Sequence, residues 1–417
     1  MKKNMFSFCI GIGFIVFGCV LIFLPNLVYS WILDLSLLYC FIQILYLCYL
    51  IFKERRWIDV LYAILTLGFF IILDLHAHFP EWIIRVSFGA YCLLVSSATL
   101  MQFIINVRYH IEHRLFLCFY WIVYAILGLF LLFTPNFNTD LLLRFFGLYF
   151  ILLGLRNAHD WYDMNNVDVK YQWSRKFRLM LPPQICVLLP DWSLSIINKK
   201  IEDGKEFSLT KRKTKEDTLL KVMVHVGPQG FQKIGHISFA YDNMVYSYGN
   251  YDASTYHLSQ TLGEGVYFNV EMQTYIENMN EIEKNSVFEY GIRISDKQKE
   301  RIEQKLEDLK ANSYRWYCPI EANDGYDDFK TYESDYASRL HYRTHAKFYK
   351  IRSGKFKAYW ALGDNCATFT DIVLGTLGSD VLSIRGITSP GTYFDYLEKE
   401  YSKPNSPVIY RTIHLRK

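Results

Sequence analysis

The sequence predicts an α-helical membrane bundle of six spans, followed by an α+β domain. Two observations predict it. Apolar residues dominate the first part of the 417-residue chain, up to about position 160, and charged residues dominate the rest. The second part mixes short alternating segments, typical of strands, with segments whose apolar residues recur every three or four positions, typical of helices.

Six apolar runs are interpreted as spanning helices, because each is close to the roughly 20 residues that cross a bilayer. They lie near residues 6–24, 30–52, 58–75, 82–105, 115–134 and 140–157. A cleaved leader peptide would explain the first run alone, and five more follow it. Soluble helices of this length would show a polar face, and these runs do not. Gln43 and Gln102, inside two of the runs, are interpreted as interhelical hydrogen-bonding residues.

Basic residues in the loops predict the orientation. They gather in residues 53–56 and 108–114, and the alternate loops carry none. The positive-inside bias therefore places the N-terminus, the basic loops and the C-terminus in the cytoplasm. The chain is expected to be an integral protein of the cytoplasmic membrane, with the lipid bilayer as a partner.

The membrane block also contains a repeated pattern. A glycine at Gly18 precedes Pro25-Asn26, and the same spacing recurs from Gly128 to Pro135-Asn136. The repeat suggests related helical hairpins. This pattern of short two-helix repeats, with a proline at the outer turn, resembles the HdeD-type family of small bacterial membrane proteins linked to acid resistance. The resemblance covers about residues 6–160 and implies a fold rather than a reaction.

Three regions are expected along the chain. Residues 1–160 form the six-helix transmembrane domain, and residues 219–417 form the cytoplasmic domain. Between them, residues 161–218 are interpreted as a juxtamembrane linker whose aromatic and basic residues suit the headgroup layer. Within the linker, Pro182-Pro183 marks a boundary, and residues 198–218 are expected to be loop-like.

The cytoplasmic domain shows an α+β pattern. Strands are expected at 220–226, 233–241, 244–251, 267–270, 287–294 and 347–360, and helices from Ser295, from Cys366 and at 393–397. Asp242-Asn243 is expected to be a tight turn between two of these strands.

Composition argues against several partners. The net charge of +4 is small, and no compact basic cluster with interleaved aromatics stands out, so nucleic acid is not expected as a partner. The nine cysteines show no CxxC or Cys/His metal spacing, so neither a zinc site nor another cofactor is expected. Their odd number and wide scatter suit reduced thiols better than disulfides.

Cys366 is the first candidate catalytic residue. It follows Gly363-Asp364-Asn365, and apolar residues then recur at helical spacing from Phe369 to Leu377. Cys366 should therefore lie in the first turn of a helix, where unpaired N–H groups and the helix dipole favour a thiolate. The alternative is a small buried cysteine at a helix start.

His236 is the second candidate, on a predicted strand. It shares one face with Ile234, Ser238 and Ala240, and the other face carries Ile237, Phe239 and Tyr241. A three-residue turn between the two strands would place Asn250 opposite His236. A two-residue turn would place Gly249 there instead.

Cysteine catalysis needs a thiolate, an imidazole within hydrogen-bond reach and a group that orients the imidazole. Cys366, His236 and Asn250 are the candidates for these roles, in the chain order His, Asn, Cys. Backbone N–H groups at the helix start would stabilise the oxyanion.

Gly235-His236 on one strand, Val245 to Gly249 on the return strand and Asn365 to Phe369 opening a helix resemble a circularly permuted papain-type domain. Such domains occur in the permuted NlpC-type and LRAT-type (lecithin:retinol acyltransferase-like) superfamily of thiol hydrolases. The resemblance covers about residues 219–400. It implies action on amide, peptide or ester bonds through an acyl-thioester.

The same resemblance implies roles for single residues. It makes Cys366 the nucleophile and His236 the base. LRAT-type members place a second histidine on the return strand, where this sequence offers Tyr248 or Asn250.

The function expected from these features is that of a membrane-anchored cytoplasmic cysteine hydrolase. It would be a peptidase, an amidase, or a lipid acyl hydrolase or acyltransferase, acting on an unknown peptide, amide or lipid ester. The alternative is a non-catalytic membrane stress or sensing protein whose soluble domain binds a partner. A third option is a transporter that uses charged residues such as Asp34 and Asp59 in the spans.

Overall fold

The computed structural model describes residues 2–75, 79–112, 114–134, 139–165, 183–203, 208–228, 233–378 and 388–417. The chain divides into two units. The first comprises Met1–Ser97 and Phe119–Trp161, and the second comprises Ala98–Cys118 and Tyr162–Lys417. The second unit therefore includes the end of the fourth predicted span and the expected linker, in addition to the expected cytoplasmic domain.

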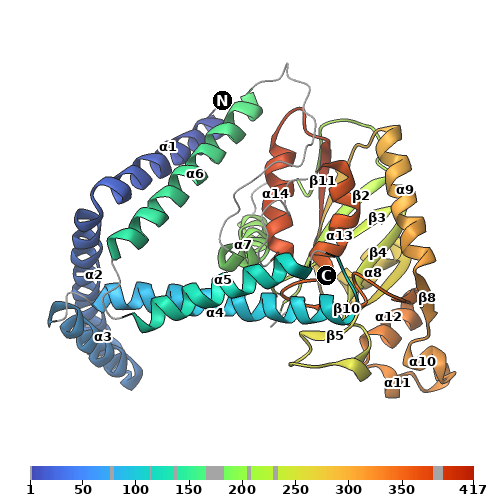
Figure 1. The fold of residues 1–417 in the computed structure, drawn as a ribbon, viewed down its shortest axis with the longest axis horizontal. Coiled ribbons are helices and arrows are strands. Elements are labelled where there is room, and N and C mark those ends of the chain that lie inside the picture. Colours follow the sequence, from blue (N-terminus) through green and yellow to red (C-terminus); the bar gives the residue numbers. More distant parts are fainter. Residues whose placement is uncertain are drawn as a thin grey trace. The chain divides into compact units, whose positions relative to one another are not determined.

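The N-terminal part of the chain is helical (Figure 1). Its helices are α1 (Lys2–Phe23), α2 (Pro25–Glu54), α3 (Trp57–Leu75), α4 (Phe79–Arg108), α5 (Arg114–Phe133) and α6 (Thr139–Asn165). Among the described residues five of them, α2 to α6, are long and apolar enough to cross a membrane. The span predicted at residues 6–24 stays a prediction, because the described apolar part of α1, Phe8–Phe23, is shorter.

Glycines mark the closest approaches between helices of the first unit. A Cβ on Gly18 of α1 would overlap the carbonyl oxygen of Gly147 on α6, and the reverse also holds. Gly89 of α4 and Gly128 of α5 crowd each other in the same way. Small residues permit such close backbone contacts between spanning helices. The two glycines of the sequence repeat, Gly18 and Gly128, therefore both lie at helix–helix contacts.

The second unit is built on an antiparallel sheet of nine strands, counted over the described residues, in the order β1-β11-β7-β2-β3-β4-β6-β9-β8. The strands are β1 (Thr210–Arg212), β2 (Leu220–Val226), β3 (His236–Tyr241), β4 (Met244–Gly249), β6 (Val266–Glu271), β7 (Ser286–Ile292), β8 (Ser313–Trp316), β9 (Lys347–Ile351) and β11 (Val408–His414). A separate ribbon pairs β5 (Leu262–Glu264) with β10 (Ala358–Trp360).

Helices cover both faces of the large sheet (Figure 1). Residues of α7 (Pro183–Glu202), α9 (Asp296–Ala311), α13 (Cys366–Leu374) and α14 (Pro390–Ser402) share the first apolar core with strand residues. Residues of α8 (Met272–Glu281), α10 (Pro319–Ala322) and α12 (Tyr336–Thr344) share the second core, and the short α11 (Phe329–Tyr332) packs at its edge. This is an α+β arrangement, as the sequence predicts.

Strand β3 alternates between the two cores. Ile237 and Phe239 belong to the core that contains α13, whereas Ala240 belongs to the core that contains α8. The side-chain period of two in a strand therefore assigns each β3 residue to one helical layer.

The turn between β3 and β4 has two residues. Asp242 and Asn243 have φ values of 48° and 60°, and Tyr241 pairs with Met244. Both central residues are left-handed, which is the type I′ turn that suits the twist of a hairpin. Continuing the register of the hairpin places His236 opposite Gly249, which decides between the two turns that the sequence leaves open.

The expectation of a loop at residues 198–218 is wrong at two places, because helix α7 extends to Glu202 and Thr210–Arg212 form β1. Residues 213–218 lie outside helices and strands, as expected. Leu194 and Ile197 of α7 lie three residues apart and pack into the first core, so tertiary packing stabilises a helix whose end is rich in charge. Strand β11, for which the sequence gives no prediction, lies between β1 and β7. Pro182 lies outside the described residues, and Pro183 begins α7.

Asp242 offers a test of the hairpin turn. A β-branched residue in the left-handed region costs about 1–2 kcal/mol. We expect Asp242→Val to lower the free energy of unfolding by about that amount, and Asp242→Gly to leave it at or above the wild-type value. Urea unfolding of the full chain in detergent micelles, followed by far-UV circular dichroism, measures the difference. Equal stability of the two variants would contradict the two-residue turn.

Candidate active site

Cys366 lies at the first position of α13, as the sequence predicts. The side-chain oxygen of Asn365 caps the helix, accepting hydrogen bonds from the N–H groups of Ala367 at 2.9 Å and Thr368 at 3.1 Å. The Asn365 amide also donates to the carbonyl oxygens of Ala361 and Thr388. These bonds fix the turn that carries the thiol, because an N-cap holds both the chain entry and the first helical turn.

The Cys366 thiol is buried among apolar side chains, with 5% of the residue exposed. Burial raises the pKa of the thiol to about 11. The backbone N–H groups of Ile237, Ala367 and Cys366 itself act in the opposite direction, because they point at the sulfur and favour the thiolate. The burial effect is larger, so the thiol is protonated at neutral pH in this structure.

His236 lies at the start of β3, and its ring contacts the opposite layer of the domain. Nε2 is 2.7 Å from Ser247 Oγ and 3.4 Å from the Tyr251 hydroxyl. Burial lowers the pKa of His236 to about 4, so the ring is neutral at pH 7. Within the described residues, no hydrogen bond joins His236 to Cys366.

The alternation of β3 explains this separation. Ile237 faces α13, and its backbone N–H is one of the groups near Cys366 that lower the pKa of the thiol. His236 is the preceding residue, so its side chain leaves the strand toward the other layer. The structure therefore brings the backbone next to His236 to the thiol, and not the imidazole.

Asn250 does not orient His236 in this geometry. Its side-chain amide donates to the carbonyl oxygens of Gln260 at 3.0 Å and Leu262 at 3.5 Å, at the β5 end of the ribbon. The two-residue turn is the reason, because it shifts Asn250 one position past the end of the hairpin. Ser247 and Tyr251, and not Asn250, contact Nε2 of His236.

A second histidine joins His236. His225 of β2 pairs with His236 across the sheet, and their rings are 5.8 Å apart. His225 Nε2 is 2.9 Å from Ser238 Oγ, and burial holds the pKa of His225 well below its usual value. The sequence alone gives no reason to expect a functional role for His225. The period of two along residues 220–226 could have placed it on the His236 face, had the β2–β3 register been known.

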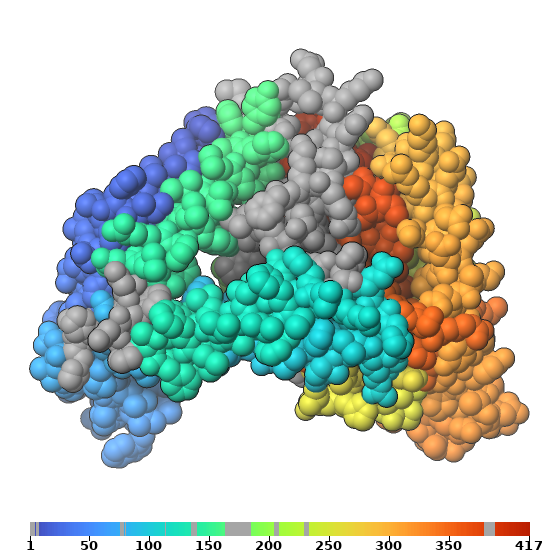
Figure 2. Space-filling view, viewed as in Figure 1, coloured from blue at the N-terminus to red at the C-terminus, as the bar shows by residue number. Residues whose placement is uncertain are grey.

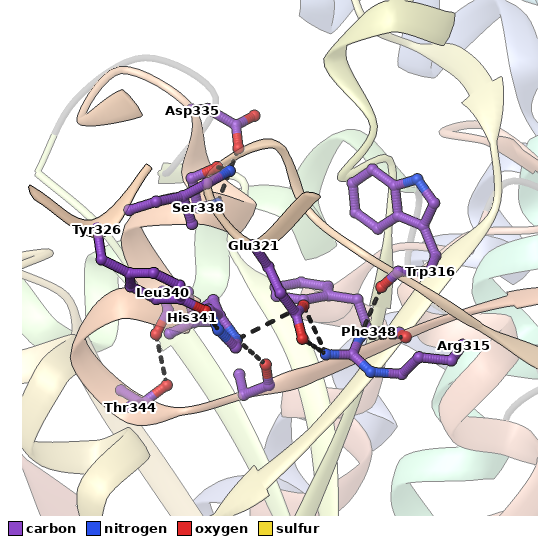
Figure 3. Close-up of polar contacts among 12 residues, drawn as sticks. Arg315, Trp316, Glu321, Tyr326, Asp335, Ser338, Leu340, His341, Thr344 and Phe348 are labelled. Carbon is purple, nitrogen blue, oxygen red and sulfur yellow. Dashed lines mark hydrogen bonds and ion pairs between the residues drawn. The ribbon is translucent and has the colours of Figure 1, made fainter. Parts of the chain in front are cut away.

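A separate cysteine–histidine cluster lies beside α10 and α12. Cys318, Glu321 and His341 each place one potential metal ligand within 4.8 Å of the others. Figure 3 shows that Arg315 points at the Glu321 carboxylate, which it contacts with two hydrogen bonds of 2.6 Å. The ring nitrogens of His341 pair with the Ala346 carbonyl and the Tyr326 hydroxyl.

A metal ion at this cluster would have to compete with the Arg315 guanidinium for Glu321 and break one of the two His341 contacts. The cluster is therefore better described as an internal ion pair with its cation already present.

No family model, curated protein or solved structure matches this chain. The resemblances to the HdeD-type and permuted papain-type families therefore stay predictions.

His236 should contribute a pH-dependent stability. Its pKa is about 4 in the folded chain and about 6.5 when unfolded, so the unfolded chain binds more protons between these values. The contribution is complete above pH 6.5 and is lost as the pH falls toward 4, at most about 3 kcal/mol. We expect His236→Gln to flatten the acid side of the stability curve, measured by urea unfolding. An acid limb identical to that of the wild type would mean that His236 titrates normally in the fold.

The Arg315 pair predicts a specific response to zinc. We expect added Zn²⁺ to leave the unfolding midpoint of the wild-type chain unchanged. Arg315→Met should lower the free energy of unfolding by about 2 kcal/mol, because Glu321 stays partly buried and loses two charge-assisted hydrogen bonds. Thermal unfolding with zinc or a chelator measures both effects. A zinc-dependent rise of the wild-type midpoint would make the cluster a metal site.

Proposed function

We propose that the chain is a membrane-anchored cysteine hydrolase or acyltransferase with Cys366 as its nucleophile and His236 as its base. The observation that carries the proposal is the environment of Cys366 Sγ. The sulfur lies at the first turn of a capped helix, where three nearby backbone N–H groups lower the pKa of the thiol against the larger effect of burial. One of them belongs to Ile237, the residue that follows His236.

The N–H groups are suited to two charged species. A helix start favours a thiolate, and the same kind of donor stabilises the oxyanion that forms when a carbonyl is attacked. A structural cysteine has no need of such donors. Three of them at one sulfur therefore favour a nucleophile over a packing residue.

The packing around Cys366 supports the permuted papain-type reading. Phe369 of α13 stacks on Phe239 of β3 and on Tyr248 of β4, with ring centroids 6.1 and 4.9 Å apart. The histidine strand, its return strand and the cysteine helix are thus neighbours, in the chain order that the resemblance implies.

Proton transfer to His236 requires the ring to leave Ser247. His236 is the first residue of β3 and follows Gly235, whose φ is 88°. The pairing between β3 and β4 begins only at Phe239, so the start of the strand is held by β2 alone. A change of backbone conformation at Gly235-His236 that turns the ring toward Cys366 is the conformational step that the mechanism needs.

The reaction then follows the general course of thiol catalysis. His236 removes the Sγ proton as sulfur attacks the carbonyl carbon, and the C=O electron pair moves to oxygen. The intermediate collapses to an acyl-thioester, and the leaving amine or alcohol takes the proton from the imidazolium. Water, or an acceptor alcohol or amine, releases the acyl group in a second, equivalent attack. The neutral histidine and protonated thiol of the structure form the starting state of this sequence.

We place the active site in the cytosol. The basic loops support it, and six spans, with α1 as the first, would return both termini to the same side. Peptides, amides and lipid esters at the inner side of the membrane are the substrate classes within reach.

The second candidate function is a non-catalytic sensing or partner-binding domain. The low exposure of Cys366 and the side of the sheet from which His236 projects favour it. It differs from the first candidate in one respect that can be measured, the reactivity of the thiol.

Labelling with an activity-based thiol probe on inverted membrane vesicles separates the two. We expect the wild-type chain to react at Cys366, and Cys366→Ala to abolish the label. His236→Ala should slow labelling about 100-fold, the usual contribution of a general base. Ser247→Ala, which releases the ring from its present partner, should speed it. Cys318→Ala is the matched control, since that buried thiol lies in the other core.

Equal labelling of the wild type and His236→Ala would overturn the catalytic proposal. The binding function would then be favoured, and Cys366 would be a packing residue.

A further inference from the structure

The turn before Cys366 is held by a residue from one of the candidate spanning helices. Gln102 of α4 accepts a hydrogen bond from the backbone N–H of Asp364 at 3.0 Å. Its amide nitrogen donates to the Asp364 carboxylate at 2.9 Å and to Asn106 Oδ1 at 2.8 Å. Gln102 therefore forms hydrogen bonds with both the backbone and the side chain of Asp364, two residues before Cys366.

The approach of the helix to the turn is close. A Cβ on Gly363 would overlap Gln102 Oε1 and the Trp360 indole, so a larger residue there would push one of these side chains away. The Trp360 indole N–H donates to the Ala98 carbonyl at 3.1 Å. Ala98, Ile105, Ala358 and Trp360 form a small apolar cluster of their own. Both polar and apolar contacts thus join the end of α4 to the segment that leads into α13.

The length of α4 allows this end to leave the hydrocarbon. The apolar helix from Glu81 to Arg108 has 28 residues, which is about 42 Å at 1.5 Å per residue. About 20 residues are enough to cross a hydrocarbon layer about 30 Å thick. About two turns of α4 are therefore in excess of the span, and the end of the helix from Ala98 belongs to the second unit, which includes Ala98–Cys118.

We propose that Gln102 is a positioning residue for Cys366, holding the Gly363–Asn365 turn so that the thiol stays enclosed and aligned with its N–H groups. The proposal rests on the function proposed above for its meaning in catalysis. Its physical content, a bond between a spanning helix and the Cys366 turn, is independent of that function.

The chain of contacts from Gln102 to the sulfur is short. Gln102 fixes Asp364, and the next residue, Asn365, caps α13 through the N–H groups of Ala367 and Thr368. The backbone N–H of Ala367 also lies near the sulfur and lowers the pKa of the Cys366 thiol. A shift of the turn therefore moves the cap and the donors around the sulfur together.

Other charged and titratable groups face the same turn. Lys355 Nζ lies 4.0 Å from Asp364 Oδ1, and the hydroxyls of Tyr248, Tyr251 and Tyr359 belong to the electrostatic surroundings of Asp364 or Cys366. Lys355 is half exposed, with 51% of its side chain accessible, so water screens its attraction. Gln102, which is 9% exposed, is the better-placed partner of Asp364.

The experiment measures alkylation of individual cysteines by iodoacetamide in the full chain in lipid vesicles, with mass spectrometry reading the Cys366 and Cys318 peptides. Gln102→Leu removes the donor and the acceptor together. Asp364→Leu removes the side-chain half of the pair. Asp364→Asn is the conservative variant, because its carbonyl oxygen can still accept from Gln102. Gln43→Leu is the matched control, a glutamine on a different spanning helix, α2.

We expect both leucine variants to raise the alkylation rate of Cys366 about tenfold, since Gln102→Leu loses both hydrogen bonds that resist opening of the turn and Asp364→Leu loses the charge-assisted one. Asp364→Asn and Gln43→Leu should stay close to the wild-type rate. Cys318 is the internal reference, and its rate should not change in any variant. Where leucine prevents the protein from accumulating, Gln102→Asn, whose amide is one methylene too short, replaces it with the same expected rise.

An unchanged Cys366 rate in the disrupting variants would overturn the proposal. A parallel rise at Cys318 would also overturn it, because it would show general loosening of the domain. Alkylation needs only a thiolate and no catalysis. Labelling by the activity-based probe that does not depend on His236 therefore counts against the proposed function. An alkylation rate that does not depend on Gln102 counts against its role as a positioning residue.

Discussion

The burial of both faces of the sheet at β3 is the constraint on which the candidate site depends. A strand covered on one side only could turn its polar residues to water. β3 has no such face, so Ile237 and Phe239 must pack against α13. The polar residues of the opposite face, His236 and Ser238, need partners, which the neighbouring strands β4 and β2 supply. Cys366 lies on the α13 side of this strand, so the strand keeps the Cys366 and His236 side chains apart.

The state of the thiol follows from a competition between burial and the helix start. Raising the pKa of Cys366 from about 9 to about 11 corresponds to about 3 kcal/mol against the thiolate. A charge at a helix terminus usually gains about 0.3–1 kcal/mol. Asn365 also draws on the N–H of Ala367, which it shares with the sulfur. The Asn365 cap orders the turn, but it also occupies an N–H group that would otherwise stabilise a thiolate at Cys366. Activation of the thiol therefore requires another group to move toward it.

The sequence predicts the local features of the fold well. It does not predict which elements, distant along the chain, pack against each other. Alternation and turn residues locate β2, β3 and β4, and α9 begins after Ser295, where the sequence predicts a helix and where Ser295 and Gln298 form a capping box. The polarity of each face of β3 is readable from the sequence, but the face that α13 would cover is a property of tertiary packing. The position of Asn250 depends on whether the turn between β3 and β4 has two or three residues, and the composition of the turn does not decide this.

For Gln102, the sequence predicts a hydrogen-bonding residue but not its hydrogen-bond partner. An amide inside a spanning helix needs hydrogen bonds, since an unpaired polar group in hydrocarbon is costly, and a neighbouring helix is the usual supplier. Here the helix is longer than the membrane requires, and the amide meets Asp364 of a loop 262 residues away in sequence. The excess length of α4 therefore has a structural use. It carries a donor and an acceptor to the segment that orders Cys366, so the geometry of the thiol depends on the end of α4.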